Sequence, residues 1–100
     1  MNVLIVDDDK LARKGLVAIV DWKKYGFEVV GDVQNGRKAL EFLRNHPVDI
    51  VFTDIDMPEI DGLELMQMCG EEFPEIKFVI LSVYESFSYA QTAIRMGALD

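Results

Sequence analysis

The chain has 100 residues, half of them hydrophobic, and a formal net charge of -8 at pH 7. This length allows at most one domain. The negative charge argues against direct contact with nucleic acid or an anionic membrane surface, because both need clustered Lys and Arg. No apolar run approaches the roughly 20 residues of a membrane span, and a single cysteine, Cys69, suits a reducing compartment, so we expect a cytoplasmic location.

Four short apolar runs predict buried β-strands, at residues 3–6, 27–30, 50–52 and 78–81. The first run, Val-Leu-Ile-Val, is continuous and rich in β-branched residues, which is typical of a strand buried on both faces. Gly31 and Asp32 follow the second run closely, so we expect that strand to be short and to lie at an edge of the sheet.

A helical pattern follows each apolar run. Pro47 is expected to stop the second helix and Gly70 to cap the third, where Cys69 is expected to be a small core residue. The defining residues of the four helices are Leu11, Ala12, Leu16 and Ile19; Ala39, Leu40 and Leu43; Leu63, Met66 and Cys69; and Ala90, Ala93 and Ile94. Four β-α units in succession predict an α/β fold with a parallel sheet and helices on both faces.

Acidic residues stand where these strands end. Asp7 and Asp8 follow the first strand and Asp54 follows the third, while Ser82 follows the fourth. In an open α/β sheet ligands bind outside the carboxyl ends of the strands. If the first strand is central and the third lies beside it, the three carboxylates are expected to lie within a few ångströms of one another. Close like charges cannot all ionise unpaired. A hard divalent cation removes the conflict, and oxygen ligands favour Mg2+ over zinc.

A carboxylate beside such a metal can act as a nucleophile and form an acyl phosphate. Asp54 is the best placed of the acids, because a loop containing Pro58 and Gly62 follows it and leads into a helix. Ser82 could donate a hydrogen bond to the bound phosphoryl group. Each of these side chains taken alone is also typical of a solvated turn or a helix cap. The convergence of three strand ends favours the phosphoryl-transfer site.

The sequence resembles a receiver domain of bacterial two-component response regulators. The resemblance covers the whole chain and rests on LIVDDD, DIVFTDIDMPEIDGLEL, FVILS and AIRMGALD. It implies a flavodoxin-like (βα)5 fold with strand order 2-1-3-4-5. The stretch from Leu11 to Leu40 further resembles receivers joined to AraC-type helix-turn-helix output domains, which implies a DNA-binding output and transcription regulation.

The resemblance also implies a role for each site residue. Asp54 would accept a phosphoryl group from a sensor histidine kinase, and Asp7 and Asp8 would be the acidic pair that binds magnesium. The backbone carbonyl of Asp56 would be a further metal ligand, and Ser82 would be the hydroxyl that moves toward the phosphoryl group. Asp9 would start the first helix instead.

In the family a lysine at the end of the fifth strand contacts the phosphoryl group, and the chain ends before that position. We therefore expect residues 1–100 to be a receiver domain that lacks its fifth β-α unit, and hence a fragment of a longer protein. The sequence leaves open whether it dimerises. It names neither the kinase nor the signal.

The leading interpretation is a phosphorylation switch, a signalling module rather than a turnover enzyme, with at most slow autodephosphorylation. One alternative is a magnesium-dependent phosphohydrolase, because Asp54-Ile55-Asp56 is a D-x-D motif. Against it, that motif should follow the first strand. The other alternative is an unphosphorylated docking module, and the intact acidic set argues against that.

Overall fold

The computed structural model describes residues 1–55 and 57–81. Within them, strands and helices alternate along the chain, as the apolar runs predict. In order they are β1 Asn2–Val6, α1 Lys10–Ile19, the short 3-10 helix η1 Trp22–Tyr25, β2 Glu28–Val33, α2 Gly36–Asn45, β3 Ile50–Asp54, α3 Gly62–Glu72 and β4 Lys77–Leu81. The fourth predicted helix lies outside the described residues.

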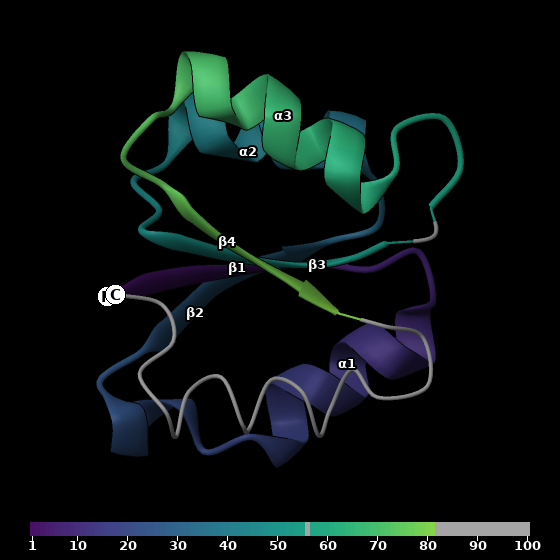
Figure 1. Cartoon of the computed structure of the whole chain (residues 1–100). Helices are drawn as coiled ribbons and strands as arrows, with labels where there is room; N and C mark the ends of the chain where they lie inside the picture. The colour runs from purple at the N-terminus through teal and green to yellow at the C-terminus, as the bar shows by residue number, and fades with distance from the viewer. Residues whose placement is uncertain (56, 82–100) are drawn as a thin grey trace.

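The four strands form one parallel sheet in the order β2-β1-β3-β4. Helix α1 covers one face of this sheet, and α2 and α3 cover the other (Figure 1). The flavodoxin-like arrangement and the edge position of β2 are thus confirmed. Because β1 and β3 are neighbours and parallel, their carboxyl ends lie side by side.

Both faces of the central strands are buried. In β1 Val3 and Ile5 pack on the α1 side, together with Phe52 of β3, whereas Leu4 and Val6 face α2 and α3. Alternate residues of a strand point to opposite faces, so a continuous apolar run fills both cores. Full burial of one such side chain contributes about 1.5–3 kcal/mol, so the two cores together fix the strand ends that carry the acids.

Strand β2 is longer than its sequence indicates. It runs through Gly31 and Asp32, which we expected to follow the strand, and a register shift between Val3 and Leu4 marks a bulge in its pairing with β1. A Cβ atom at Gly31 would lie 2.7 Å from the Phe42 ring of α2. The glycine therefore admits the close approach of a helix and does not end the strand.

Two expectations about helices need correction. Gly70 does not cap α3, because the helix continues to Glu72 and Phe73 is the C-cap residue. In α1, Leu11 and Ile19 are exposed although they follow helical spacing, and Arg13 is buried in their place. Helical period alone does not determine which side of a helix meets the sheet, and Arg13 has polar partners there.

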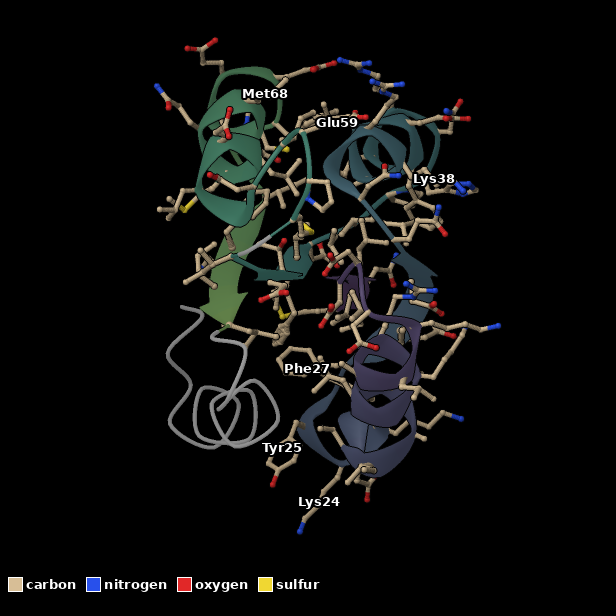
Figure 2. The ribbon with its side chains drawn as sticks, turned by 90° about the vertical axis from the view of Figure 1, so that its right-hand side faces the viewer. Lys24, Tyr25, Phe27, Lys38, Glu59 and Met68 are labelled. Carbon is tan, nitrogen blue, oxygen red and sulfur yellow. The ribbon has the colours of Figure 1, made fainter. Side chains whose placement is uncertain are left out.

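The aromatic residues after α1 form a packed corner. Trp22 and Phe27 are buried and contact each other at 6.4 Å between ring centroids, and Trp22 also packs on Phe52. Tyr25 is more exposed and projects away from the sheet (Figure 2). None of the helices in the described ranges is long and apolar enough to cross a membrane.

Candidate metal centre at the carboxyl edge of the sheet

Three carboxylates meet at the carboxyl edge of the sheet. One oxygen from each of Asp7, Asp8 and Asp54 lies within 4.8 Å of the others. Asp7 directly follows β1 and Asp54 ends β3, so the pairing of these two strands brings them together. The proximity predicted from the sequence is therefore observed. Ser82 and Asp56, the other two predicted site residues, lie outside the described residues.

Asp7 is held by backbone hydrogen bonds. Its N–H donates to the carbonyl of Val33 at 3.1 Å, and its Oδ1 accepts from the N–H of Asp9 at 2.9 Å. Burial raises the pKa of Asp7, and the hydrogen bond from Asp9 opposes this. The neighbouring charges of Asp8 and Asp9 raise the pKa further. A cation in contact with Asp7 would favour its ionised form and so offset the effects of burial and of the neighbouring charges on its pKa.

Asp54 is buried at the end of β3, with 6% of its surface exposed. The N–H of Ile55 donates to its Oδ1 at 2.9 Å, and the hydroxyl of Thr53 donates to its backbone carbonyl at 3.1 Å. The Ile55 N–H therefore contacts the carboxylate itself, whereas the Thr53 hydroxyl contacts the backbone of Asp54. Asp8, by contrast, is exposed, so the cluster can be reached from solvent.

The loop after Asp54 rests on the start of α2. Gly36 lies so close to Ile60 that a Cβ atom at Gly36 would fall 2.8 Å from the Ile60 Cβ. Arg37 donates to Glu59 at 2.9 Å, and Figure 2 shows Glu59 on the α2 and α3 side of the sheet. Glu59 has a φ of 68°, which is unusual for a residue other than glycine. These contacts fix one wall of the acidic site.

An open cleft of about 370 Å³ lies beside Asp8 on this wall, lined by Asp8, Gln34, Asn35, Pro58 and Glu59. The start of α3, further along the same loop, is stabilised by a capping box in which Asp61 accepts from the N–H of Glu64 and Glu64 accepts from the N–H of Asp61. Of the three carboxylates, Asp8 lines this cleft, so a small ligand in the cleft would lie beside Asp8.

The donor set fits a hard divalent cation. Three carboxylate oxygens at this spacing, open to solvent through Asp8, suit the octahedral preference of Mg2+ for oxygen ligands and retained water. The only histidine, His46, caps the far end of α2 and stacks on Phe42. It is therefore remote from the acids. Asp9 is the N-cap of α1, as expected, and accepts from the N–H groups of Leu11 and Ala12.

Sequence reasoning missed the residues behind the acidic cluster. Arg13 is buried, and it contacts both Asp32 of β2 and the backbone of Asp7. Its spacing from Leu16 and Val20, three and seven residues on, places it on the buried side of α1. That spacing was available in the sequence, but the partner in β2 depends on tertiary pairing.

Comparison with known proteins identifies the family to which this chain belongs. Residues 3–100 match the model of the response regulator receiver domain. The chain is 35% identical over 96 residues to a transcriptional regulatory protein, YesN, of Bacillus subtilis, covering 96% of the chain and 26% of that protein. The chain therefore spans about a quarter of that relative's length.

Solved structures agree. The receiver domain of AraT, a response regulator from Geobacillus stearothermophilus, is 41% identical with a TM-score of 0.76, over 95% of this chain and 74% of that one. A two-component transcriptional regulator AraC from Clostridium phytofermentans is 33% identical with a TM-score of 0.77, over 93% and 72%. The chain belongs to the response regulator receiver family. This family is one of signalling switches, and the comparisons lend no support to the phosphohydrolase alternative.

Proposed function

We propose that Asp54 is the phosphoacceptor of this receiver domain and takes its phosphoryl group from a sensor histidine kinase. The observation that carries the proposal is the convergence of Asp7, Asp8 and Asp54 within 4.8 Å. Family membership supports it, because response regulators of two-component systems act through such a transfer.

In the proposed reaction a carboxylate oxygen of Asp54 attacks the phosphorus of a phosphohistidine. A new O–P bond forms, the N–P bond breaks, and the imidazole leaves with its electron pair and takes up a proton. The N–H of Ile55 holds the Asp54 carboxylate in place. The reaction requires no further oxidant or co-reactant.

Asp7, Asp8 and Asp54 would hold Mg2+ through their side chains, together with the backbone carbonyl of Asp56. When bound, Mg2+ supplies positive charge that offsets the charge of the phosphoryl oxygens. The hydroxyl of Ser82 is proposed to donate a hydrogen bond to the phosphoryl group. The roles of Asp56 and Ser82 rest on the family resemblance.

The acyl phosphate would act by shifting a conformational equilibrium and not by turnover, with slow autodephosphorylation as the reset step. The output would be a DNA-binding domain of the AraC type in the parent protein, acting in the cytoplasm. Support for this output comes from relatives described as transcriptional regulators. This acidic segment itself would not contact DNA or membranes.

Intact mass spectrometry tests the proposal. The chain is incubated with acetyl phosphate and Mg2+, and one added phosphoryl group is expected. Asp54→Asn should abolish the adduct, as should removal of Mg2+ with EDTA. Asp21→Asn is the matched control, since Asp21 is exposed and makes no side-chain cap hydrogen bond. An adduct that persists in Asp54→Asn would refute the assignment. Sustained release of many phosphate equivalents per chain would favour a hydrolase.

A further inference from the structure

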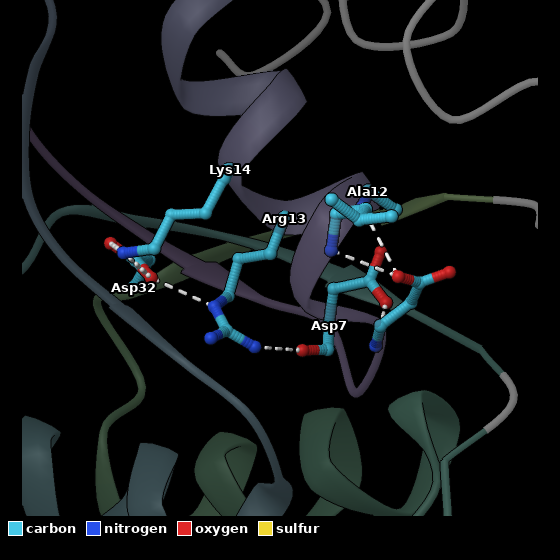
Figure 3. Close-up of polar contacts among 7 residues, drawn as sticks. Asp7, Ala12, Arg13, Lys14 and Asp32 are labelled. Atoms are coloured by element: carbon cyan, nitrogen blue, oxygen red, sulfur yellow. Dashed lines mark hydrogen bonds and ion pairs between the residues drawn. The ribbon is translucent and has the colours of Figure 1, made fainter.

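Arg13 is a buried cation beside the acidic site. It is 8% exposed, and its guanidinium bonds in two directions (Figure 3). Nε donates to Oδ1 of Asp32 at 2.7 Å, and Nη1 donates to the backbone carbonyl of Asp7 at 2.8 Å. Burying a guanidinium is costly unless its donors are paired. The two bonds pair Nε and Nη1, and at the same time they join α1, β2 and the loop after β1.

Asp32 holds Arg13 from the other side. Its carboxylate also accepts from Nζ of Lys14 at 2.9 and 3.1 Å, so two cations of α1 converge on one acid of β2. The next residue of β2, Val33, accepts the N–H of Asp7 through its carbonyl. Both backbone polar groups of Asp7 are therefore held, the N–H by Val33 and the carbonyl by Arg13.

The carbonyl of Asp7 belongs to the peptide group that joins Asp7 to Asp8. Because a peptide group is planar, the direction of this carbonyl fixes the direction of the Asp8 N–H and the position of the Asp8 Cα. Exposed loops ordinarily leave such a plane free to rotate. Here a rotation would turn the Asp7 carbonyl away from Arg13 and displace Asp8 relative to Asp54.

We propose that Arg13 is a positioning residue for the metal site. Its guanidinium holds the Asp7–Asp8 peptide in the orientation that brings both carboxylates to Asp54, and Asp32 anchors the guanidinium. Arg13 is not a metal ligand. Its effect on Mg2+ affinity is exerted through the backbone of Asp7, and this role rests on the proposed function for the identity of the metal.

The positive charge of Arg13 and its hydrogen bond to Asp7 predict opposite changes in Mg2+ affinity when Arg13 is substituted. A cation near three carboxylates repels Mg2+, so removing the charge of Arg13 should on Coulombic grounds strengthen metal binding. Loss of the positioning bond should weaken it. Substitutions of residues that support metal ligands from behind typically reduce metal affinity about 10–100-fold. The sign of the change in Mg2+ affinity therefore separates the two effects.

The experiment is a calorimetric titration with Mg2+ of the wild-type chain and four variants. Arg13→Met is expected to weaken Mg2+ binding about tenfold or more. Arg13→Lys keeps the charge but lacks the planar fork that reaches two acceptors, so it should also weaken binding, though less. Asp32→Asn should act in the same direction. Lys14→Met is the matched control, because among the described residues Lys14 bonds to Asp32 and not to Asp7, and it should change affinity less than about twofold.

Mg2+ affinity in Arg13→Met and Arg13→Lys equal to or tighter than wild type would overturn the proposal. Circular dichroism of each variant shows whether it is folded. If Arg13→Met does not fold, Arg13→Lys decides the question by the same criterion, because it keeps the charge and changes only the geometry. A wild-type chain that binds Mg2+ but gains no phosphoryl group would contradict the proposed phosphoacceptor. The comparison of Mg2+ affinities between the wild type and the Arg13 variants would still test the role of Arg13. A wild-type chain that binds no Mg2+ would overturn both.

Discussion

Gly62 lies directly against the backbone carbonyl of Asp54, and a Cβ atom at position 62 would overlap that oxygen. The N–H of Gly62 also donates to the carbonyl of Ile55 at 2.9 Å. The first residue of α3 is thus packed on the strand end that carries the proposed phosphoacceptor. The packing makes the geometry of Asp54 depend on the absence of a side chain eight residues later.

Gly62→Ala is therefore expected to destabilise the chain by about 1–3 kcal/mol, the usual cost of overpacking, and to weaken Mg2+ binding because Asp54 must move. Gly70→Ala is the control within the same helix. Apart from its chain neighbours and the backbone of its own helix, no atom of the described residues lies within 4 Å of a Cβ at Gly70, so this change should stabilise the chain by roughly 1 kcal/mol through helix propensity. Urea denaturation measures both. Equal effects of the two substitutions would show that the contact with Asp54 is unimportant.

Asp32 gives a prediction for pH dependence. Burial by itself raises the pKa of Asp32, but hydrogen bonds from Lys14 and Arg13 outweigh burial, and the pKa lies below its ordinary value of 3.8. A carboxyl whose pKa is lower in the folded state contributes stability that is present above the unfolded pKa and is lost as the pH falls through the folded pKa.

Asp32→Asn should accordingly lower the free energy of unfolding by about 1–3 kcal/mol at pH 7, with a smaller difference from wild type as the pH falls below 3.8. Denaturant titrations at a series of pH values check this. The exposed pair Arg44–Glu72 supplies the control, since Arg44→Met should change the free energy of unfolding less than Asp32→Asn does. A difference between Asp32→Asn and wild type that grows toward acid pH would contradict the assignment.

Cys69 is fully buried in the core under α3, and burial raises the pKa of its thiol to about 11. At pH 7.5 almost none of it is thiolate, the reactive form. We expect the native chain to resist alkylation by iodoacetamide and the urea-unfolded chain to react rapidly, as measured by intact mass. Rapid labelling of the native chain would mean that this part of the core opens readily.

Glu59 has a left-handed backbone conformation, with a φ of 68°. A side chain in that conformation costs about 1–2 kcal/mol, whereas the ion pair of Glu59 with Arg37 is exposed on both sides and contributes about 0–1 kcal/mol. Glu59→Gly should therefore raise the free energy of unfolding by about 1 kcal/mol. Arg37→Met, which removes the ion pair alone, should leave it nearly unchanged. Glu59→Gly proving less stable than Arg37→Met would count against backbone strain.

Much of this architecture could be predicted from the sequence, because its signals are local. The apolar run from Val3 to Val6 predicts a strand buried on both faces. The acids that follow it predict an acidic site at the carboxyl edge of the sheet. Asp7 directly follows β1 and Asp54 ends β3, and because these two strands are parallel neighbours the two acids lie close together. The position of β3 beside β1, on which that inference depends, was implied by the resemblance to receiver domains.

The remainder depends on contacts that no local pattern contains. Gly31 suggests a strand end by itself, yet the Phe42 ring, eleven positions away, requires a residue without a side chain there. The residue type of Arg13 predicts a surface cation, but β2 brings Asp32 to it and the two form an ion pair. Gly70 resembles a cap, but the helix continues past it to Glu72. In each case tertiary packing overrides the local preference of the residue.

The most direct test of the phosphoacceptor assignment identifies the modified atom itself. The chain is phosphorylated with acetyl phosphate and Mg2+ and treated with borohydride, which reduces an aspartyl phosphate to homoserine, and peptide mass spectrometry then locates the change. Homoserine at position 54, and its absence when Mg2+ is withheld, is the expected result. Homoserine at Asp7 or Asp8, or none in a folded chain that has gained a phosphoryl group, would show that Asp54 is not the acceptor.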